Sequence, residues 1–187
     1  MTAWERLGIP LQLAMDEEDW EKPFSKLSAK AHPDAGGERM EFEALCQARD
    51  VLKDPYQRLE RWLDAKGKHV GHSSAVSPEV AVMFEKVADL KLCLSEWLSL
   101  GEKTSSQLGR ALHQRKGLQL RKWLESCLEE VTRWEGGMEN EFGELSKASE
   151  KGDYERALEV RGELGFLRKW RSQLRGFYGQ LWEGLEF

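Results

Sequence analysis

The chain has 187 residues, of which 40% are hydrophobic and 33% are charged, and its formal net charge is −5. This composition is typical of a folded domain, and it argues against a disordered chain and against the broad basic surface of a nucleic-acid-binding protein. No apolar run reaches the roughly 18 to 20 residues that span a bilayer, so we expect no membrane partner.

The cysteines and the first residues indicate where the chain acts. Three cysteines, an odd number and widely spaced, disfavour a disulfide framework and favour a reducing interior. The chain begins without a signal or transit pattern. We therefore expect a monomeric protein that stays in the cytoplasm.

Apolar residues recur at helical spacing along almost the whole chain, and alternating β-branched runs are absent, so an all-α fold is predicted. Helices are expected at 2–7, 16–31, 38–53 and 55–63. Asp16 is suited to cap the second helix, because its short side chain can accept backbone N–H groups and acidic residues follow it in the first turn. Pro23 lies inside this helix, where we expect a kink rather than a break.

Glycines, serines and histidines interrupt the helical spacing at residues 67–77, which predicts a linker between a first domain, 1–66, and a second domain, 78–187. Three helices are expected in the second domain, packed as an antiparallel bundle. The first ends at Gly101, the second continues through Gly136-Gly137, and the third follows Asp153. The apolar residues that define these helices are Val80, Phe84, Val87, Leu90, Leu94, Trp97 and Leu98; Leu124, Leu128, Val131, Met138, Phe142 and Leu145; and Ala157, Val160, Leu164, Leu167, Leu174, Leu181 and Leu185.

The second predicted helix carries a basic stripe. Lys22, Lys26 and Lys30 are spaced four residues apart, which places the three ammonium groups on one helix face. By spacing alone such a stripe is usually only a solvated surface. The residues after Lys30 therefore decide its interpretation.

A proline turn comes directly after the basic stripe. Pro33 disfavours helical geometry at His32 and ends the helix, and Asp34 then lies in an exposed turn before two glycines. A bare His-Pro-Asp tripeptide is a weak signal by itself. Here it joins a basic helix face to a small tip that carries an imidazole and a carboxylate.

Together with the helices on both sides, this tip resembles a J domain, the helical hairpin that activates DnaK-type ATPase chaperones. The stretch FEALCQARDVLKDPYQRLERW, residues 42–62, is similar to the third and fourth helices of that family. Two positions depart from it, because Ala31 and Ala35 stand where the family often has tyrosine and lysine. The resemblance implies that the chaperone is contacted by Lys26, Lys30, His32, Pro33 and Asp34.

Two further stretches narrow the resemblance to the HscB and Jac type, the J co-chaperones of iron-sulfur cluster biogenesis. They are LGIPLQLAMDEEDW, residues 7–20, and DYERALEVRGELGFLRKWRSQL, residues 153–174. The similarity is poor at about 101–120, where extra residues are inserted. This type implies an HscA-like DnaK-type chaperone and a cluster scaffold protein as partners. The scaffold-facing residues would be Met83, Phe84, Val87 and Phe166, beside which the family's acidic positions are Ala88 and Lys91 here.

Helical periodicity weighs against part of that scaffold-binding set, since it favours core positions for most of these side chains. Phe166 is the exception, because it is rotated about 100° from its neighbour Leu167, which lies on the apolar seam. With Trp170 one turn further, Phe166 is a candidate partner surface.

Other chemistry is sparse. His69 and His72 could contribute to a metal site, but histidines in a glycine-serine linker without nearby carboxylates or cysteines are more typical of solvent-exposed side chains. His113 lies in a polar run and indicates no function. There is no phosphate-binding glycine loop and no nucleophile-base pair, so no catalytic residue, metal or cofactor is predicted, and the chain is not expected to be an enzyme.

The leading interpretation is a co-chaperone that stimulates the ATPase of a DnaK-type chaperone and delivers an iron-sulfur cluster scaffold to it. Two alternatives remain open. The second domain could serve a different client as a J-domain adaptor, or the chain could carry a metal or a cluster through His69, His72 and a cysteine.

Overall fold

The computed structural model describes residues 1–68, 78–101 and 106–185, and within these ranges all regular structure is helical, which confirms the predicted all-α fold. None of the described helices is both long and apolar enough to cross a bilayer. The chain forms two compact units, one comprising Met1–Ser73 and Gly137–Leu164 and the other Ser74–Gly136 and Gly165–Phe187. The elements are α1 (Ala3–Leu7), α2 (Glu17–Ala31), the 3-10 turn η1 (Pro33–Ala35), α3 (Arg39–Lys53), α4 (Pro55–Ala65), α5 (Pro78–Gly101), α6 (Gln107–Asn140), α7 (Phe142–Glu150) and α8 (Glu155–Leu185).

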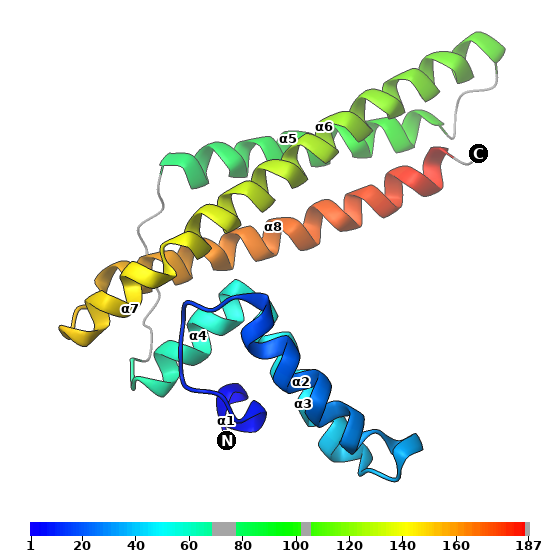
Figure 1. Ribbon diagram of the computed structural model, residues 1–187. Coiled ribbons are helices and arrows are strands. Elements are labelled where there is room, and N and C mark those ends of the chain that lie inside the picture. Colours follow the sequence, from blue (N-terminus) through cyan, green and yellow to red (C-terminus); the bar gives the residue numbers. More distant parts are fainter. Residues whose placement is uncertain (69–77, 102–105, 186–187) are drawn as a thin grey trace. The chain divides into compact units, whose positions relative to one another are not determined.

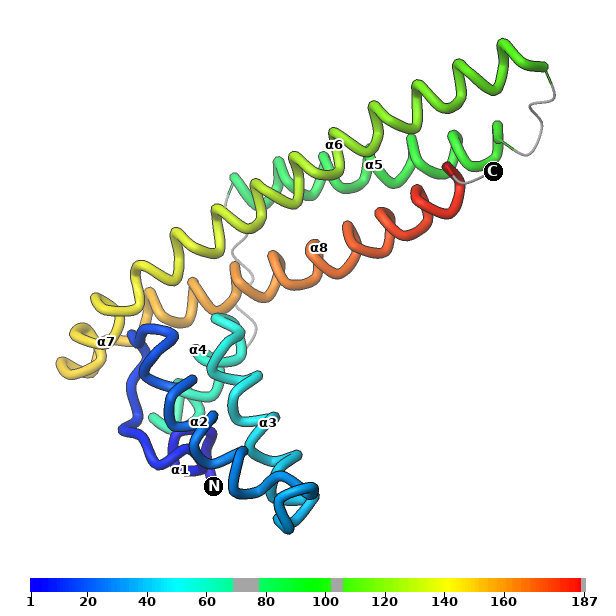
Figure 2. Tube along the Cα trace, turned by 45° about the vertical axis from the view of Figure 1, so that its right-hand side comes forward, coloured from blue at the N-terminus to red at the C-terminus, as the bar shows by residue number. Residues whose placement is uncertain are grey.

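In the first unit, α2 and α3 lie side by side as a hairpin, with α1 packed on both and α4 packed on α3 (Figures 1 and 2). Local signals set the helix ends. Thr2 caps α1 through a capping box with Glu5, and the Asp54 carboxylate accepts the Gln57 N–H at the start of α4. The buried side chains of this hairpin include Trp4, Leu7, Leu13, Trp20, Phe24, Leu45, Ala48, Leu52, Leu59, Trp62 and Leu63.

The four helices predicted before residue 67 agree with the structure to within two residues at each end. α2 begins directly after Asp16, whose backbone N–H donates to the Asp19 carboxylate at 2.8 Å. The helix then continues through Pro23 to Ala31. Burial of Trp20, Phe24 and Ala31 along one face supports the helix where the proline removes a hydrogen bond.

Residues 137–164 complete the first unit through charged contacts with α4. The Arg58 side chain is only 3% exposed, and its guanidinium pairs with Glu139 and lies over the ring of Phe142. Arg161 pairs with Glu60 at 2.7 Å. Removing one member of a buried pair leaves an uncompensated charge, so these contacts fix which surfaces meet.

The predicted division into two domains, 1–66 and 78–187, stays a prediction. Most of the expected linker, residues 69–77, lies outside the described residues. In the structure, residues 137–164 belong to the same compact unit as the N-terminal helices. The contact between buried Arg58 and Glu139 supports this grouping, since it joins two residues that are 81 positions apart in sequence.

In the second unit, α5, α6 and α8 lie side by side with α6 antiparallel to the other two, as predicted for the bundle (Figures 1 and 2). Trp97 is fully buried at the centre of one apolar cluster with Leu94, Leu120 and Leu181. Its indole fills the space left by two glycines, since a Cβ at Gly117 or Gly184 would lie 2.7 Å from the ring.

His113 supports the same cluster, although its polar sequence surroundings indicate no role. Its ring stacks on Trp97 at 4.3 Å, and two hydrogen bonds of 2.8 Å join each side chain to the other residue's carbonyl oxygen. Because each ring nitrogen donates to the facing carbonyl, the N-terminal part of α6 is fixed against α5 by a reciprocal contact.

The prediction of one continuous helix from Leu124 to Leu145 is wrong at one residue. Gly136 and Gly137 do not interrupt α6, as expected, but the helix ends at Asn140 and α7 starts at Phe142. Between them, the Glu141 N–H bonds to the Met138 carbonyl three residues back, which tightens the turn. The Glu141 carboxylate instead pairs with Arg156 of α8 at 2.9 Å, a tertiary contact that helical spacing does not reveal.

Candidate functional site

The His-Pro-Asp tip is a single 3-10 turn between α2 and α3. His32 ends α2 and caps η1, and its carbonyl accepts the N–H groups of Ala35 at 2.9 Å and Gly37 at 3.0 Å. Its Nδ1 accepts the Asp34 N–H at 3.2 Å. In the neutral imidazole the proton therefore lies on Nε2, and the Asp34 carboxylate, 92% exposed, remains open to a partner.

The two glycines after the tip are required by its geometry. Gly36 has φ of +83°, a left-handed conformation that a side chain disfavours. At Gly37 an added Cβ would lie 2.3 Å from the Ala31 carbonyl group. The chain thus passes directly over the end of α2, and this close approach holds the turn in place.

Packing beneath the tip is aromatic. The His32 ring meets Phe42 of α3 edge to face, with centroids 5.0 Å apart. Ala31 is 4% exposed, so this departure from the family pattern changes packing rather than the solvent-facing surface. Ala35 is exposed, so the lysine missing at this position is a loss to the surface itself.

The basic stripe of α2 is not uniform. Lys22 pairs with Glu18 one turn earlier, whereas Lys26 and Lys30 are exposed and form no ion pair with any described residue. An open pocket of about 500 Å³ lies beside the last turns of α2 and the tip. It is lined by Ser25, Ser28, Ala29, His32, Asp34, Ala35 and Phe42.

The five predicted chaperone-binding residues are therefore brought together at one end of the hairpin. Lys26 and Lys30 lie on the last two turns of α2, and His32, Pro33 and Asp34 follow after Ala31. The arrangement presents ammonium groups, an imidazole N–H donor and an exposed carboxylate, 3.7 Å from His32 Nδ1, beside a shallow hollow. Such a surface can pair with an acidic patch and accept a cationic side chain.

The predicted scaffold-binding residues are divided by the structure. Met83 and Val87 are 1% and 6% exposed and belong to the core of the second unit, whereas Phe84 is 65% exposed. The expected seam contained Phe84, and this expectation is wrong by one residue. Buried positions of α5 recur at 80, 83, 87, 90, 94 and 97, so Met83 takes the inward position and turns Phe84 out.

An exposed apolar stripe runs through Phe84 along α5. Ala81, Phe84, Ala88 and Leu92 are spaced three or four residues apart and all are exposed. Lys91 is exposed beside them. We call these four residues the α5 stripe; of the predicted scaffold-binding residues, it contains Phe84.

Phe166 lies near the level of Phe84. A Cβ at Gly184 of α8 would lie 3.0 Å from Leu98 of α5, and the two helices run in the same direction (Figure 1). Phe84 comes fourteen residues before Leu98, and Trp170 comes fourteen residues before Gly184. Phe84 therefore lies level with Trp170, which is one helical turn beyond Phe166. Phe166 is partly exposed, but Trp170 is buried, so the expectation of a paired aromatic surface is wrong for Trp170.

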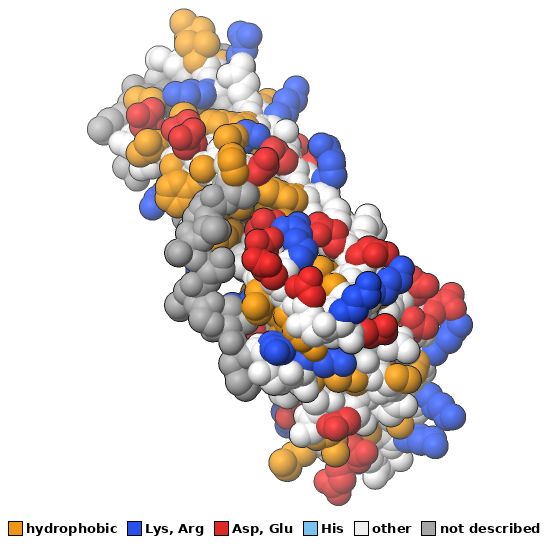
Figure 3. Space-filling model, turned by 90° about the vertical axis from the view of Figure 1, so that its left-hand side faces the viewer, with side chains coloured by type: hydrophobic (Ala, Val, Ile, Leu, Met, Phe, Trp, Pro, Cys, Tyr) orange, Lys and Arg blue, Asp and Glu red, His pale blue; other side chains and the backbone are white. Residues whose placement is uncertain are grey.

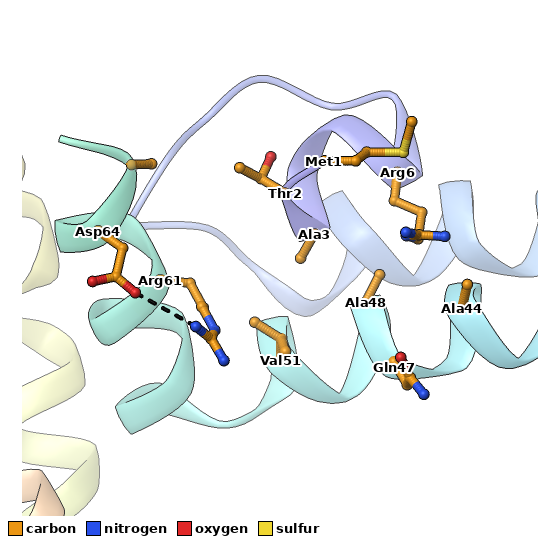
Figure 4. Close-up of a pocket in the computed structure, with 11 residues that line it drawn as sticks. Met1, Thr2, Ala3, Arg6, Ala44, Gln47, Ala48, Val51, Arg61 and Asp64 are labelled. Carbon is orange, nitrogen blue, oxygen red and sulfur yellow. Dashed lines mark hydrogen bonds and ion pairs between the residues drawn. The ribbon is translucent and has the colours of Figure 1, made fainter. Parts of the chain in front are cut away.

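A pocket of about 440 Å³ also lies on the first unit, between α1, α3 and α4 (Figure 4). Arg6 of α1 and the Arg61–Asp64 ion pair of α4 border it, and small side chains such as Ala44 and Ala48 form the α3 wall. None of the predicted chaperone-binding residues lines this pocket. It is separate from the tip.

Within the described parts of the chain, no group of three potential metal ligands occurs. His69 and His72 lie outside those parts. Cys127 is buried, and this burial, reinforced by Glu130, raises the pKa of its thiol. A protonated buried thiol is a poor ligand and a poor nucleophile.

Charge on the face shown in Figure 3 is mixed, with acidic and basic side chains interspersed among apolar ones. A single sign of charge does not dominate this face. On this face the charge therefore varies from place to place and forms no broad field of one sign.

The chain is similar to known proteins in part of its sequence and in its fold. No protein-family model matches the chain. Over 55 residues it is 44% identical to chaperone protein dnaJ 2 of Arabidopsis thaliana and 42% identical to chaperone protein dnaJ A6 of rice, Oryza sativa. This similarity covers 29% of the chain and only 13% of each relative.

A solved structure matches almost the whole chain. Chaperone HscB from Vibrio cholerae aligns with a TM-score of 0.55 and 19% identity, covering 97% of this chain and 99% of that one. The chain thus has the fold of HscB, and the predicted resemblance is confirmed in sequence to dnaJ proteins and in fold to HscB.

Proposed function

We propose that this chain, which combines a sequence similar to J-domain chaperone proteins with the fold of HscB, is a co-chaperone that stimulates ATP hydrolysis by a DnaK-type chaperone. The observation that carries the proposal is the tip, where His32 and Asp34 end a helix face on which Lys26 and Lys30 have no ion pair among the described residues. The chain acts as an activator rather than as an enzyme, in the cytoplasm and as a monomer.

Docking and triggering fall to different parts of the tip. The ammonium groups of Lys26 and Lys30 steer the hairpin to an acidic surface of the chaperone. The exposed Asp34 carboxylate then pairs with a cationic side chain of the chaperone and favours the conformation that hydrolyses ATP. His32 keeps the turn in shape, because its Nδ1 accepts the Asp34 N–H.

The second half of the proposal is delivery of an iron-sulfur cluster scaffold protein. The α5 stripe, with Phe84 at 65% exposure, offers the apolar contact, and the partly exposed Phe166 lies one turn from its level. An exposed aromatic on an apolar strip is a typical binding hot spot. Met83 and Val87 contribute by holding Phe84 outward, since both are buried.

A different client is the second candidate. Ala88 and Lys91 stand on or beside the stripe where the scaffold-binding family carries acidic residues, so the charge of this surface is changed. A client that needs those carboxylates would bind weakly here, and an apolar or acidic client would bind well.

Chaperone activation is tested by single-turnover ATP hydrolysis of a purified DnaK-type chaperone with the parent chain, His32→Gln and Asp34→Asn. Each tip variant should lose at least about 10-fold of the stimulation, as expected for one charge-assisted contact. Asp50→Asn, an exposed carboxylate on α3 away from the tip, is the matched control and should stimulate like the parent. Full stimulation by both tip variants would disprove the proposed trigger.

Scaffold delivery is tested by calorimetric titration of an iron-sulfur scaffold protein into the full chain. Phe84→Ala should weaken binding by about 10-fold or more, the usual cost of truncating an aromatic hot spot. Met40→Ala, at an apolar side chain 83% exposed on the first unit, controls for nonspecific loss of apolar area. Binding unchanged by Phe84→Ala, or no binding by the parent, would favour the different-client candidate.

A further inference from the structure

Two segments of the second unit are rich in basic residues, although the chain as a whole is acidic. Residues 106–124 contain five basic residues and no acidic residue, in a chain whose net charge is −5. Residues 165–182 contain four more basic residues and again no acidic one. The basic residues of the two segments are Arg110, Arg115, Lys116, Arg121 and Lys122, and Arg168, Lys169, Arg171 and Arg175.

These two segments pack against each other in the folded unit. Leu120 of α6 and Leu181 of α8 belong to the same buried cluster. The Arg121 guanidinium lies 5.9 Å from the centre of the Trp182 ring. Trp182 therefore lies beside the basic segment of α6, whereas Arg171 lies further along α8, where it pairs with Glu135 of α6.

The same part of α6 exposes leucines on the side that faces away from the core. Leu108, Leu112 and Leu118 are 72%, 57% and 51% exposed, whereas Leu120 and Leu124 on the opposite side are buried. Trp182 of α8 is 48% exposed. Three exposed leucines on one helix, rimmed by polar residues, are typical of a surface that contacts a partner.

Cations without partners lie between these leucines. Arg115, Lys116 and Lys122 are exposed, and none forms an ion pair with another residue that the structure describes. We call Leu108, Leu112, Arg115, Lys116, Leu118 and Lys122 the basic apolar surface. It includes none of the residues of the proposed co-chaperone function.

We propose that the basic apolar surface binds the surface of an anionic lipid bilayer. Outward leucines interleaved with Arg and Lys, beside an exposed tryptophan, have the chemistry of a helix that lies in the headgroup region with its cations on lipid phosphates. None of the residues of the basic apolar surface lines either of the two described pockets, which lie on the first unit. A fluid membrane accepts such a face without a matching groove.

Nucleic acid fits this surface less well. Phosphates would satisfy the cations, but three exposed leucines give no stacking or hydrogen-bonding groups for bases. Among the described residues of this unit, Trp182 and Phe84 are the exposed large aromatic side chains.

The expectation of no membrane partner rested on the lack of a spanning segment. A peripheral contact through one basic helix needs neither a spanning segment nor a positive chain.

The test is sedimentation of the full chain with large unilamellar vesicles of phosphatidylcholine alone and with about 30% phosphatidylglycerol. Binding should require phosphatidylglycerol and should weaken as salt rises. Arg115→Gln with Lys116→Gln and Lys122→Gln should lower the partition coefficient by roughly 100-fold, because each cation near an anionic surface contributes about 5-fold. Leu108→Ser with Leu112→Ser and Leu118→Ser should lower it by about 10-fold or more.

Two matched controls keep the test specific. Lys53→Gln with Arg133→Gln and Lys151→Gln removes three exposed cations from outside the surface, and Met40→Ser removes an exposed apolar side chain. Both should bind vesicles like the parent. The proposal is overturned if the parent does not bind anionic vesicles or if the leucine variant binds them like the parent. It is also overturned if a 20-nucleotide single-stranded DNA, added at a phosphate concentration equal to the lipid concentration, displaces the chain from the vesicles.

Discussion

The tip and the α5 stripe differ in what determines their exposure. At the tip, the backbone alone places His32 and Asp34 at the surface, because Pro33 ends α2 and Gly36 and Gly37 permit the turn. On α5, neighbouring residues with similar side chains, Met83 and Phe84, have opposite environments. A functional group on a turn can therefore be located from local sequence, whereas one on a helix depends on the rotation that core packing selects.

The largest expected effect tests that rotation on α5. Met83→Ala should lower the free energy of unfolding by about 2 to 5 kcal/mol, because it removes a buried side chain and leaves a cavity. Phe84→Ala should change it by less than about 0.5 kcal/mol, since the ring is 65% exposed. Urea unfolding of both variants measures the difference, and equal losses would mean that Phe84 is not the outward residue.

Alanine substitutions at two glycines in different environments, Gly37 and Gly136, test the geometry of the turn. Gly37→Ala should destabilise the chain by about 1 to 3 kcal/mol, because the new Cβ would collide with the Ala31 carbonyl. Gly136→Ala, at an open helical position of α6, should instead stabilise it by about 0.5 to 1 kcal/mol. Thermal unfolding of the two variants gives the sign of each change, and stabilisation by Gly37→Ala would contradict the close approach at the tip.

The exposed lysines should matter for encounter rather than for folding. Lys26→Gln with Lys30→Gln should slow association with the chaperone about 10-fold at low salt, and the difference should shrink as salt rises. Lys22→Gln is the matched control, because Lys22 already pairs with Glu18. Association rates from stopped-flow fluorescence decide the matter; an equal effect of Lys22→Gln would remove the distinction between paired and unpaired lysines.

The smallest effect concerns a carboxylate within the fold rather than on its surface. Burial works to raise the pKa of Glu60, but hydrogen bonds from Arg161 and Tyr56 outweigh it and leave the pKa below its ordinary value of 4.5. A lowered pKa in the folded state means that the ion pair stabilises the chain fully above pH 4.5, and that this stabilisation is lost as the pH falls through the folded pKa.

Glu60→Gln should therefore be less stable than the parent at pH 7, by less than about 1 kcal/mol after solvent screening. The two should converge in stability as the pH falls below 4.5. Parallel stability curves for parent and variant from pH 7 to pH 3 would show that the Arg161–Glu60 contact carries no net ionic stabilisation.

Much of the fold could be predicted because its signals are local. Asp16, Pro33 and Pro55 mark helix ends through backbone chemistry, and the apolar spacing of α8 marks Val160, Leu164 and Leu167 as core. The break at Glu141 could not be predicted, since the spacing of Met138, Phe142 and Leu145 stays helical across it.

In the candidate site, too, local signals could be predicted from the sequence, whereas contacts between distant segments could not. The five residues of the tip and its helix could be named from the sequence because they lie close together in the chain and match the J-domain pattern, and the structure brings them together. Buried Arg58 and the Trp97–His113 contact were missed, because each joins segments far apart in the chain. Only the two glycines Gly117 and Gly184, inside otherwise regular helices, hinted that a large side chain lay against them.

The central claim is that one chain joins a chaperone trigger to a scaffold-binding surface, and a mixing experiment tests it most directly. ATP hydrolysis by the DnaK-type chaperone is measured with scaffold protein and with Asp34→Asn, Phe84→Ala, or an equal mixture of the two variants. The account predicts that the scaffold-dependent stimulation given by the parent is absent from the mixture, because neither variant carries both functions. Full recovery in the mixture would contradict the claim, since trigger and scaffold binding would then act from separate molecules.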